Sequence, residues 1–287
     1  MMSDPFVFPI PSGLDRPGLQ TLDLTFETRR AAIDPFLVVS LFEMSQPAFP
    51  PHPHAGFSVA TYIFPESETG FWNQDSLGNV NPIPPGALHL TVAGSGVLHE
   101  ETVTRSGRAA RGLQIWIDHA DADRTVAPRA HHVAAAEVPR TTGEGVTRAT
   151  LLGPDFAPVA ARIVDVDMTA GSTLRETIPE GETGFAVIRE GALDTPQGRA
   201  GPATVVLASD GYLDLTAVAP SRLTLFGGPP LRHEIVATGP FVASTEAQAR
   251  KFRDDYTAGA MGHLEPFAQS RLDHDFDNST GHEGDLP

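Results

Sequence analysis

Short runs of apolar and β-branched residues, separated by Gly and Pro, occupy most of the chain between about residues 21 and 225. Clear examples are FLVVSLF (36–42), SVATYIF (58–64) and GLQIWI (112–117). Short strands that recur at regular intervals with turn residues between them are typical of a β-sandwich or β-barrel. The pattern therefore predicts an all-β protein.

The run at 112–117 also shows the alternation expected of a strand with one face in a core. Its three aliphatic residues fall on one side, and Gln114 and Trp116 fall on the other. Bulky aromatic residues usually belong to the core, so we expect Trp72 and Trp116 to be core residues rather than a platform for a substrate.

A stretch between about residues 125 and 150 interrupts this pattern. It is rich in Ala, Arg, Gly and Pro and has no steady apolar period, so it is interpreted as a connector in which His131 and His132 are solvated. Strand-like runs resume between residues 161 and 226. A duplicated β-barrel follows as the expected architecture.

One helix is predicted, from Thr245 to about residue 258. Thr245 and Gln248 have the spacing of a capping box, and apolar residues then recur at helical intervals. The tail after residue 266 is acidic and nearly free of aliphatic residues, so we expect it to be a dispensable, solvated segment.

Composition narrows the classes of function. The 287-residue chain has no Cys, which excludes disulfides, thiolate metal sites and thiol catalysis. Its formal net charge of −16 opposes direct binding to DNA or RNA. We see no signal peptide and no apolar stretch of membrane-spanning length, and we expect a cytoplasmic protein without membrane contact.

Two pairs of residues carry the candidate chemistry. His52 and His54 are two positions apart, as are His99 and Glu101. Positions i and i+2 of a strand point to the same face, so each pair can direct two ligand atoms toward one point. A single His-x-His pair is commonly a feature of an exposed loop, and Glu101 by itself fits a solvated side chain equally well. Two pairs beside Gly-rich turns add a second interpretation of equal weight, a site for a divalent transition metal.

Several segments, in matching order, resemble the pirin family of two-barrel cupin proteins. They are DPFL (34–37), HPHAGF (52–57), TY (61–62), DSLG (75–78), PG (85–86), TVAGSG (91–96), HEE (99–101), GLQIW (112–116), GPFV (239–242) and FRDDY (252–256). The resemblance covers about residues 20 to 265. It implies two stacked cupin barrels with a short C-terminal helix.

The domain limits that follow are residues 1–130 for a metal-binding barrel, 131–265 for a second barrel without metal that includes the helix near 245–258, and 266–287 for the acidic tail. The resemblance implies one metal ion, usually iron, with Ni, Mn, Cu, Co or Zn as alternatives. Residue by residue, its ligands fall on His52, His54, His99 and Glu101. Ala55 stands where the family commonly has Arg, a departure that we expect to alter the mouth of the pocket.

The resemblance leaves two functions open. The favoured one is a metal-dependent dioxygenase of the quercetin 2,3-dioxygenase type, which acts on a small aromatic, flavonol-type substrate with O2 and uses Glu101 as the catalytic base. The alternative is a non-enzymatic, redox-dependent transcriptional co-regulator that binds a protein partner. An open, aromatic-lined pocket at the metal would favour the enzyme, and a closed pocket beside an exposed apolar patch would favour the regulator.

Overall fold

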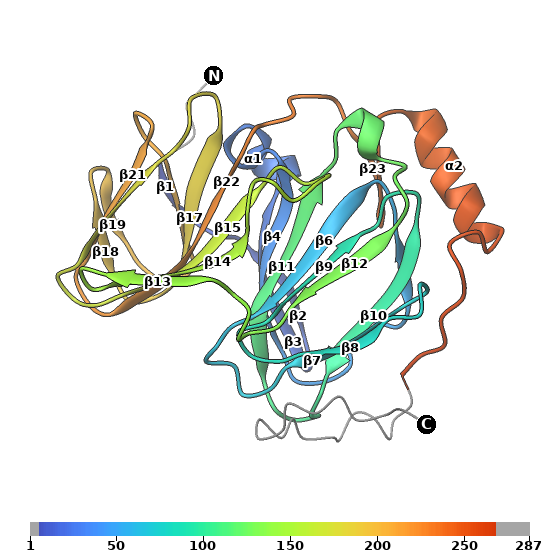
Figure 1. The fold of residues 1–287 in the computed structure, drawn as a ribbon, viewed down its shortest axis with the longest axis horizontal. Helices are drawn as coiled ribbons and strands as arrows, with labels where there is room; N and C mark the ends of the chain where they lie inside the picture. Colours follow the sequence, from blue (N-terminus) through green and yellow to red (C-terminus); the bar gives the residue numbers. More distant parts are fainter. Residues whose placement is uncertain (1–5, 268–287) are drawn as a thin grey trace.

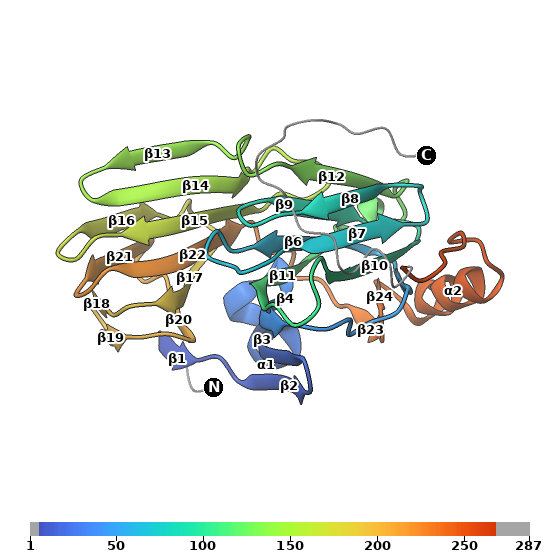
Figure 2. The ribbon, with the colours of Figure 1, turned by 90° about the horizontal axis from the view of Figure 1, so that it is seen from below.

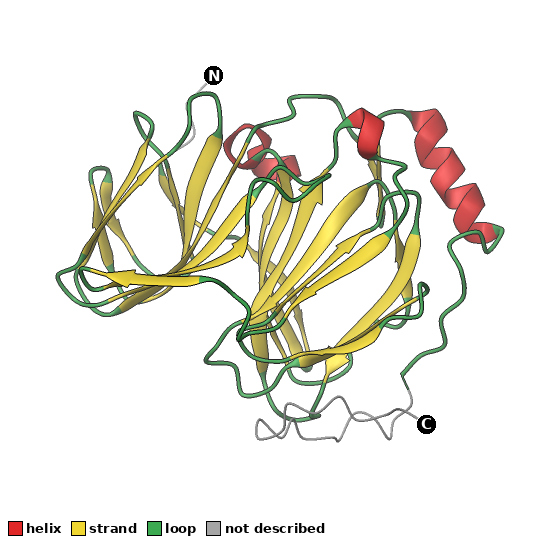
Figure 3. Ribbon diagram, in the orientation of Figure 1, coloured by secondary structure: helices red, strands yellow, loops and turns green. Residues whose placement is uncertain are grey.

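Antiparallel strands dominate this computed structural model, which describes residues 6–267 (Figure 3). Two β-barrels lie side by side, and a helix near the C-terminal end covers the outer side of the first one (Figure 1). The predicted all-β class with two cupin barrels and a short C-terminal helix is thus confirmed.

The first barrel is made of two sheets that face each other. The larger sheet has the order β12 (Arg129–Val133), β9 (Leu88–Val92), β6 (Phe57–Ile63), β11 (Ala110–Asp118), β4 (Phe36–Met44), β3 (Leu19–Thr25) and β2 (Ser12–Arg16). The smaller sheet has the order β5 (His52–His54), β10 (Val97–Val103), β7 (Phe71–Asp75) and β8 (Val80–Ile83).

The second barrel repeats this plan. Its larger sheet has the order β1 (Val7–Pro9), β20 (Thr204–Leu207), β17 (Thr183–Glu190), β22 (Ser221–Gly228), β15 (Arg162–Met168), β14 (Val146–Leu152) and β13 (Arg140–Gly143). Its smaller sheet has the order β16 (Thr173–Thr177), β21 (Tyr212–Ala217), β18 (Leu193–Thr195) and β19 (Gly198–Ala200). A separate hairpin consists of β23 (Val236–Thr238) and β24 (Phe241–Ala243).

The largest apolar core lies between the two barrels. Leu113, Ile115 and Ile117 of β11 belong to it, together with Phe185 and Phe226 of the second barrel. The alternation predicted for this strand is confirmed, because Gln114 and Trp116 face the interior of the first barrel instead. The same strand therefore joins the barrels on one face and lines the first barrel on the other.

The predicted C-terminal helix is α2 (Glu246–Thr257). The Thr245 hydroxyl accepts a hydrogen bond from the backbone N–H of Gln248, as the capping box predicts. A short helix, α1 (Phe26–Ile33), and a 3₁₀ turn (Asp121–Asp123) add to it. The hydropathy pattern does not reveal α1, because it buries only Ile33 and its backbone leaves helical geometry at Arg29.

The prediction that residues 125–150 form a connector is wrong in one respect. This stretch contains strands β12, β13 and most of β14. Strands β12 and β13 each form the outer edge of a large sheet, and none of their residues is buried. An edge strand exposed on both faces shows no apolar alternation, so the sequence pattern misses it.

Both ends of the described chain cross from one half to the other. β1 near the N-terminus pairs with β20 of the second barrel (Figure 2). The segment that contains β23, β24 and α2 packs on the first barrel, where Phe241, Ala249 and Phe252 contact Ala55 and Leu98. The domain limits at residues 130 and 265 stay a prediction, and packing between the two halves crosses the first of them.

From residue 268 onward, the predicted acidic tail lies outside the described residues. Within residues 6–267, no helix is long and apolar enough to cross a membrane.

Candidate metal centre

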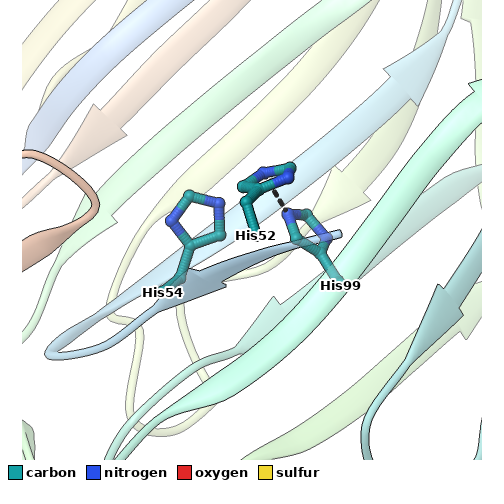
Figure 4. A group of neighbouring side chains, drawn as sticks. All are labelled: His52, His54 and His99. Atoms are coloured by element: carbon teal, nitrogen blue, oxygen red, sulfur yellow. Dashed lines mark hydrogen bonds between the residues drawn. The ribbon is translucent and has the colours of Figure 1, made fainter. Parts of the chain in front are cut away.

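Strands β5 and β10 bring three histidines together inside the first barrel (Figure 4). His52 and His54 point to the same side of β5, and His99 lies opposite His52 on β10. The Nε2 atoms of His52 and His99 are 3.1 Å apart, and one ring nitrogen from each of the three lies within 4.8 Å of the others. This spacing matches a shared cation bound by three imidazoles.

Burial keeps these imidazoles uncharged. Desolvation, followed by the neighbouring His52, lowers the pKa of His54 to about 3, and desolvation holds the pKa of His99 well below its ordinary value. Within the described part of the chain, neither ring nitrogen of His54 nor Nδ1 of His99 forms a hydrogen bond. The Pro240 carbonyl acts in the opposite direction on the pKa of His54 but does not offset the effects of burial and of His52. A neutral imidazole with one ring nitrogen free is the form in which histidine binds a metal ion, and His52 keeps Nε2 on the side of His99 because its Nδ1 donates to the Pro50 carbonyl.

Glu101 lies next to this cluster but is held by different partners. Thr61 Oγ1 and Gln114 Nε2 both donate to its Oε2, at 2.8 and 3.3 Å. Burial raises the pKa of Glu101 to about 7, although these two hydrogen bonds act in the opposite direction. The group of side chains with ligand atoms within 4.8 Å of one another consists of the three histidines and leaves Glu101 outside. Its Oε1 is not engaged by Thr61 or Gln114 and is the oxygen left for a cation or a substrate proton.

A cavity of about 380 Å³ leads from the histidines toward solvent. It is lined by Leu14, Leu19, Thr21, Asp23, Thr25, Val38, Ser40, Phe42, Met44, Phe49, His52, His54, Phe71, Glu101, Gln114, Trp116 and Pro240. Two of these residues, Leu14 and Phe49, are exposed large apolar side chains, so the cavity reaches the surface. A larger cavity of about 680 Å³ lies beside α1 and residues 178–184, but no histidine lines it.

Trp116 packs against the buried cluster around Phe57, as expected of a core residue, but it also lines the cavity. Its ring lies edge-on to His54, with a distance of 5.3 Å between the ring centroids. Residue 116 sits on the inner face of β11 two positions after Gln114, so it faces the site rather than the core between the barrels. Trp72 does not line this cavity.

A row of polar residues crosses the large sheet at the level of Glu101. Directly paired positions run from one edge strand to β3 in the order His132, His89, Thr61, Gln114, Ser40 and Asp23. Sequence reasoning assigned no role in the site to any of the six, because the signal is the pairing of strands that are far apart in the chain. His132 is half-buried on β12, and its Nδ1 lies 3.3 Å from Asn81 Nδ2, which corrects its placement in a solvated connector.

Ala55 does not lie at the mouth of the pocket, contrary to expectation. It is fully buried, and its side chain packs with Phe241 and Phe252 beneath α2. Being next to His54 along the chain, it faces the opposite side from the ligands. The small side chain at this position therefore accommodates the C-terminal segment and leaves the charge of the cavity unchanged.

Comparisons with known proteins agree with this site. Residues 20–117 match the family described as "Pirin", and residues 163–262 match "Pirin C-terminal cupin domain". The chain is 31% identical over 263 residues to the "Pirin-like protein" of Solanum lycopersicum, covering 87% of this chain and 85% of that protein. This chain belongs to the pirin family.

Two solved structures share the pirin fold of this chain. The quercetin 2,3-dioxygenase of Acinetobacter baumannii superposes with a TM-score of 0.78 at 22% identity, over 89% of this chain and 96% of that one. The bacterial pirin YhhW of Escherichia coli, in complex with nickel(II), superposes with a TM-score of 0.64 at 18% identity, over 78% of this chain and 99% of that one.

Proposed function

We propose that this pirin is a metal-dependent dioxygenase that oxidises flavonol-type phenolic compounds with O2. The observation that carries the proposal is the convergence of three imidazoles, of which those of His54 and His99 are fully buried, with His52 and His54 lining an open, mostly apolar cavity. The names of the two solved relatives, one a quercetin 2,3-dioxygenase and one a nickel(II) complex, support it.

His52, His54, His99 and Glu101 would hold one divalent transition metal, for which we favour Fe(II), with Ni, Mn, Cu, Co or Zn as alternatives. Three neutral nitrogen ligands and one carboxylate suit such a cation and leave positions open for substrate and O2. When bound, the metal would supply a Lewis acid for the phenolic oxygen and a site for O2.

The chain's own residues prepare the substrate. Glu101 would accept the proton of the flavonol 3-hydroxyl, and a carboxyl pKa near 7 suits a base that works near neutral pH. Thr61 and Gln114 fix the orientation of its carboxylate through Oε2. Trp116 and the stacked pair of Phe42 and Phe71, whose ring centroids are 5.1 Å apart, form an apolar wall that excludes water from a flat ring.

The open cavity also favours the enzyme over a non-enzymatic regulator. A regulator needs an exposed docking surface but no route to the metal, whereas an enzyme needs a route for its substrate. Leu14 and Phe49 are exposed at the outer end of the cavity that reaches His52 and His54, which gives such a route.

Metal analysis combined with oxygen uptake tests the proposal. Protein loaded with Fe(II) should hold one ion per chain and consume O2 when quercetin is added. His54→Ala should lose both properties, and His263→Ala, an exposed histidine remote from the cavity, should keep them. Full metal occupancy after all three site histidines become Ala, or no O2 uptake with any of the six metals, would overturn it.

A further inference from the structure

The cavity that the histidines line also contains a carboxylate, that of Asp23, on a strand two places across the sheet from Gln114. Asp23 of β3 lines the cavity, where its Oδ1 accepts a hydrogen bond from Ser40 Oγ at 2.5 Å and its Oδ2 accepts one from Thr21 Oγ1 at 3.0 Å. Thr21 is fixed in turn by the backbone N–H of Leu14, which donates to its hydroxyl at 2.7 Å. Asp23 is thus held in place rather than swinging freely.

Strand β2 packs closely against the Asp23 carboxylate at Gly13. A Cβ added to Gly13 of β2 would lie 1.8 Å from Asp23 Oδ2 and 2.4 Å from Thr21 Oγ1. The backbone of β2 therefore rests directly on the carboxylate from outside, while the cavity meets it from inside. An ionised carboxylate can accept about four hydrogen bonds, and the two hydroxyl groups use two of them.

The distance between the two polar ends of the cavity suits a molecule of several rings. Asp23, Ser40 and Gln114 are directly paired neighbours on three successive strands, and Gln114 contacts Glu101. Strands in a sheet lie about 4.8 Å apart, so Asp23 is about 10 Å across the sheet from Gln114. Between these ends the wall includes Val38, Phe42 and Trp116.

We infer that Asp23 selects substrates that carry a hydroxyl group on the ring remote from the metal. This inference rests on the proposed function and adds the substrate class to it. The metal and Glu101 would hold one end of the flavonol, and Asp23 would accept a hydrogen bond from a phenolic hydroxyl at the other end. Since a hydrogen bond to a charged group in a partly buried site contributes about 10-fold or more to recognition, compounds without that hydroxyl should be poorer substrates.

Two flavonols that differ only in this group provide the test. Kaempferol has a hydroxyl on its remote ring and galangin has none there. For the parent protein, kcat/KM for kaempferol should exceed that for galangin by about 10-fold or more, and Asp23→Asn, which removes the charge of the acceptor, should lower this ratio several-fold. Asp15→Asn, an exposed acid of the same hairpin that does not line the cavity, should keep the parent ratio.

Binding without turnover separates this inference from the proposed function. Both flavonols are titrated into metal-loaded protein without O2, with quenching of tryptophan fluorescence as the signal, because Trp116 lines the cavity. If both compounds bind and neither is oxidised, the dioxygenase proposal fails while the ratio of the dissociation constants still tests Asp23. A parent ratio near one, or an unchanged ratio in Asp23→Asn, would overturn the inference. Absence of binding by both flavonols would overturn both proposals.

Discussion

Glu101 and the three histidines occupy one barrel interior but have different surroundings. Burial lowers the pKa of each of the three histidines, whereas it raises the pKa of Glu101 to about 7, and Thr61 and Gln114 orient the Glu101 carboxylate. A ligand needs only its lone pair, but a base must also change its protonation state during turnover. This difference in surroundings supports the two separate roles.

Glu101→Gln should therefore reduce turnover far more than metal content. The amide keeps an oxygen ligand and nearly the same shape but cannot accept a proton, and a general base contributes about 10² to 10⁴ in rate. Metal analysis and single-turnover oxidation of quercetin measure the two effects. Glu100→Gln is the matched control, because Glu100 lies on the same strand and bonds instead to Gln74 and the backbone of Phe267. A parent-like rate in Glu101→Gln would reduce Glu101 to a ligand.

Buried histidines also predict sensitivity to acid. Burial lowers the pKa of His119 to about 4 and that of His54 and His89 to about 3. Below pH 6.5 the unfolded chain binds protons that the folded chain does not, so the free energy of unfolding falls as the pH falls. Glu101, whose pKa is raised, acts with the opposite sign between about pH 4.5 and 7. The three histidines outweigh it.

Metal-free protein should accordingly melt at a lower temperature at pH 5 than at pH 7. His119→Gln should show a smaller difference between the two pH values, because it removes one titrating group that is buried beside Ser58. His263→Gln, which changes an exposed histidine, should keep the parent difference. Thermal unfolding at both pH values measures this, and an equal difference in all three proteins would contradict the role of His119.

At the scale of elements, the position of β5 depends on a contact with the C-terminal segment. Gly56 follows this strand with a φ of +88°, and its carbonyl accepts a hydrogen bond from the buried Arg124 at 2.9 Å. A Cβ at this position would lie 1.8 Å from the backbone oxygen of Val242. Val242 in turn donates its N–H to the carbonyl of Ala55. The strand that carries His52 and His54 is therefore fixed from outside the barrel.

Gly56→Ala should destabilise the protein and weaken metal binding together. Gly78→Ala is a close control, because Gly78 has a φ of +93° but no atom within 4 Å of the added Cβ. Left-handed backbone costs a residue with a Cβ about 1–2 kcal/mol, which both variants share. The additional loss in Gly56→Ala measures the collision with Val242. Urea unfolding and metal titration report the two effects, and equal losses in both variants would show that the contact has no consequence for the site.

The elements that could be predicted from the sequence are those whose pattern is local. The alternation in β11, the capping box of α2 and the i, i+2 spacing of His52 and His54 depend only on near neighbours in the chain. Edge strand β12 and the short helix α1 bury too little to leave a pattern. The partners of Glu101 depend on the pairing of strands, which no local pattern encodes. The motif at 61–62 shows both cases, since Thr61 bonds to Glu101 while Tyr62 faces the other barrel.

At the scale of the whole molecule, the contact of Tyr62 with the second barrel matters most. The Tyr62 hydroxyl donates to Asp165 Oδ2 at 2.8 Å, and Arg189 Nη2 donates to Asp165 Oδ1 at 2.7 Å. Arg189 also forms an ion pair with Glu66 of the first barrel. These groups are largely buried, so each depends on its partners to offset the loss of water. The network joins the barrels at the back of the strand that orients Glu101.

Asp165→Asn should destabilise the whole protein by about 3 kcal/mol, because it leaves a buried guanidinium with one carboxylate partner fewer. Asp194→Asn, which removes an exposed ion pair with Arg199 in the second barrel, should cause no measurable change. Urea unfolding followed by tryptophan fluorescence makes the comparison, since Trp72 and Trp116 both report on the first barrel. An unchanged midpoint for Asp165→Asn would mean that the network contributes nothing to joining the barrels.

Because each end of the described chain packs on the barrel formed by the other half, these contacts form late in synthesis. A ribosome releases β5 and β10 long before it makes residues 236–257, so Ala55 and Leu98 stay uncovered until synthesis is nearly complete. β1 likewise cannot pair until β20, almost 200 residues further along the chain, has been synthesised. The strand that carries His52 and His54 therefore receives its outer support only when the chain is almost finished. Prematurely terminated chains would contain every proposed ligand and yet lack the segment that holds β5 in place.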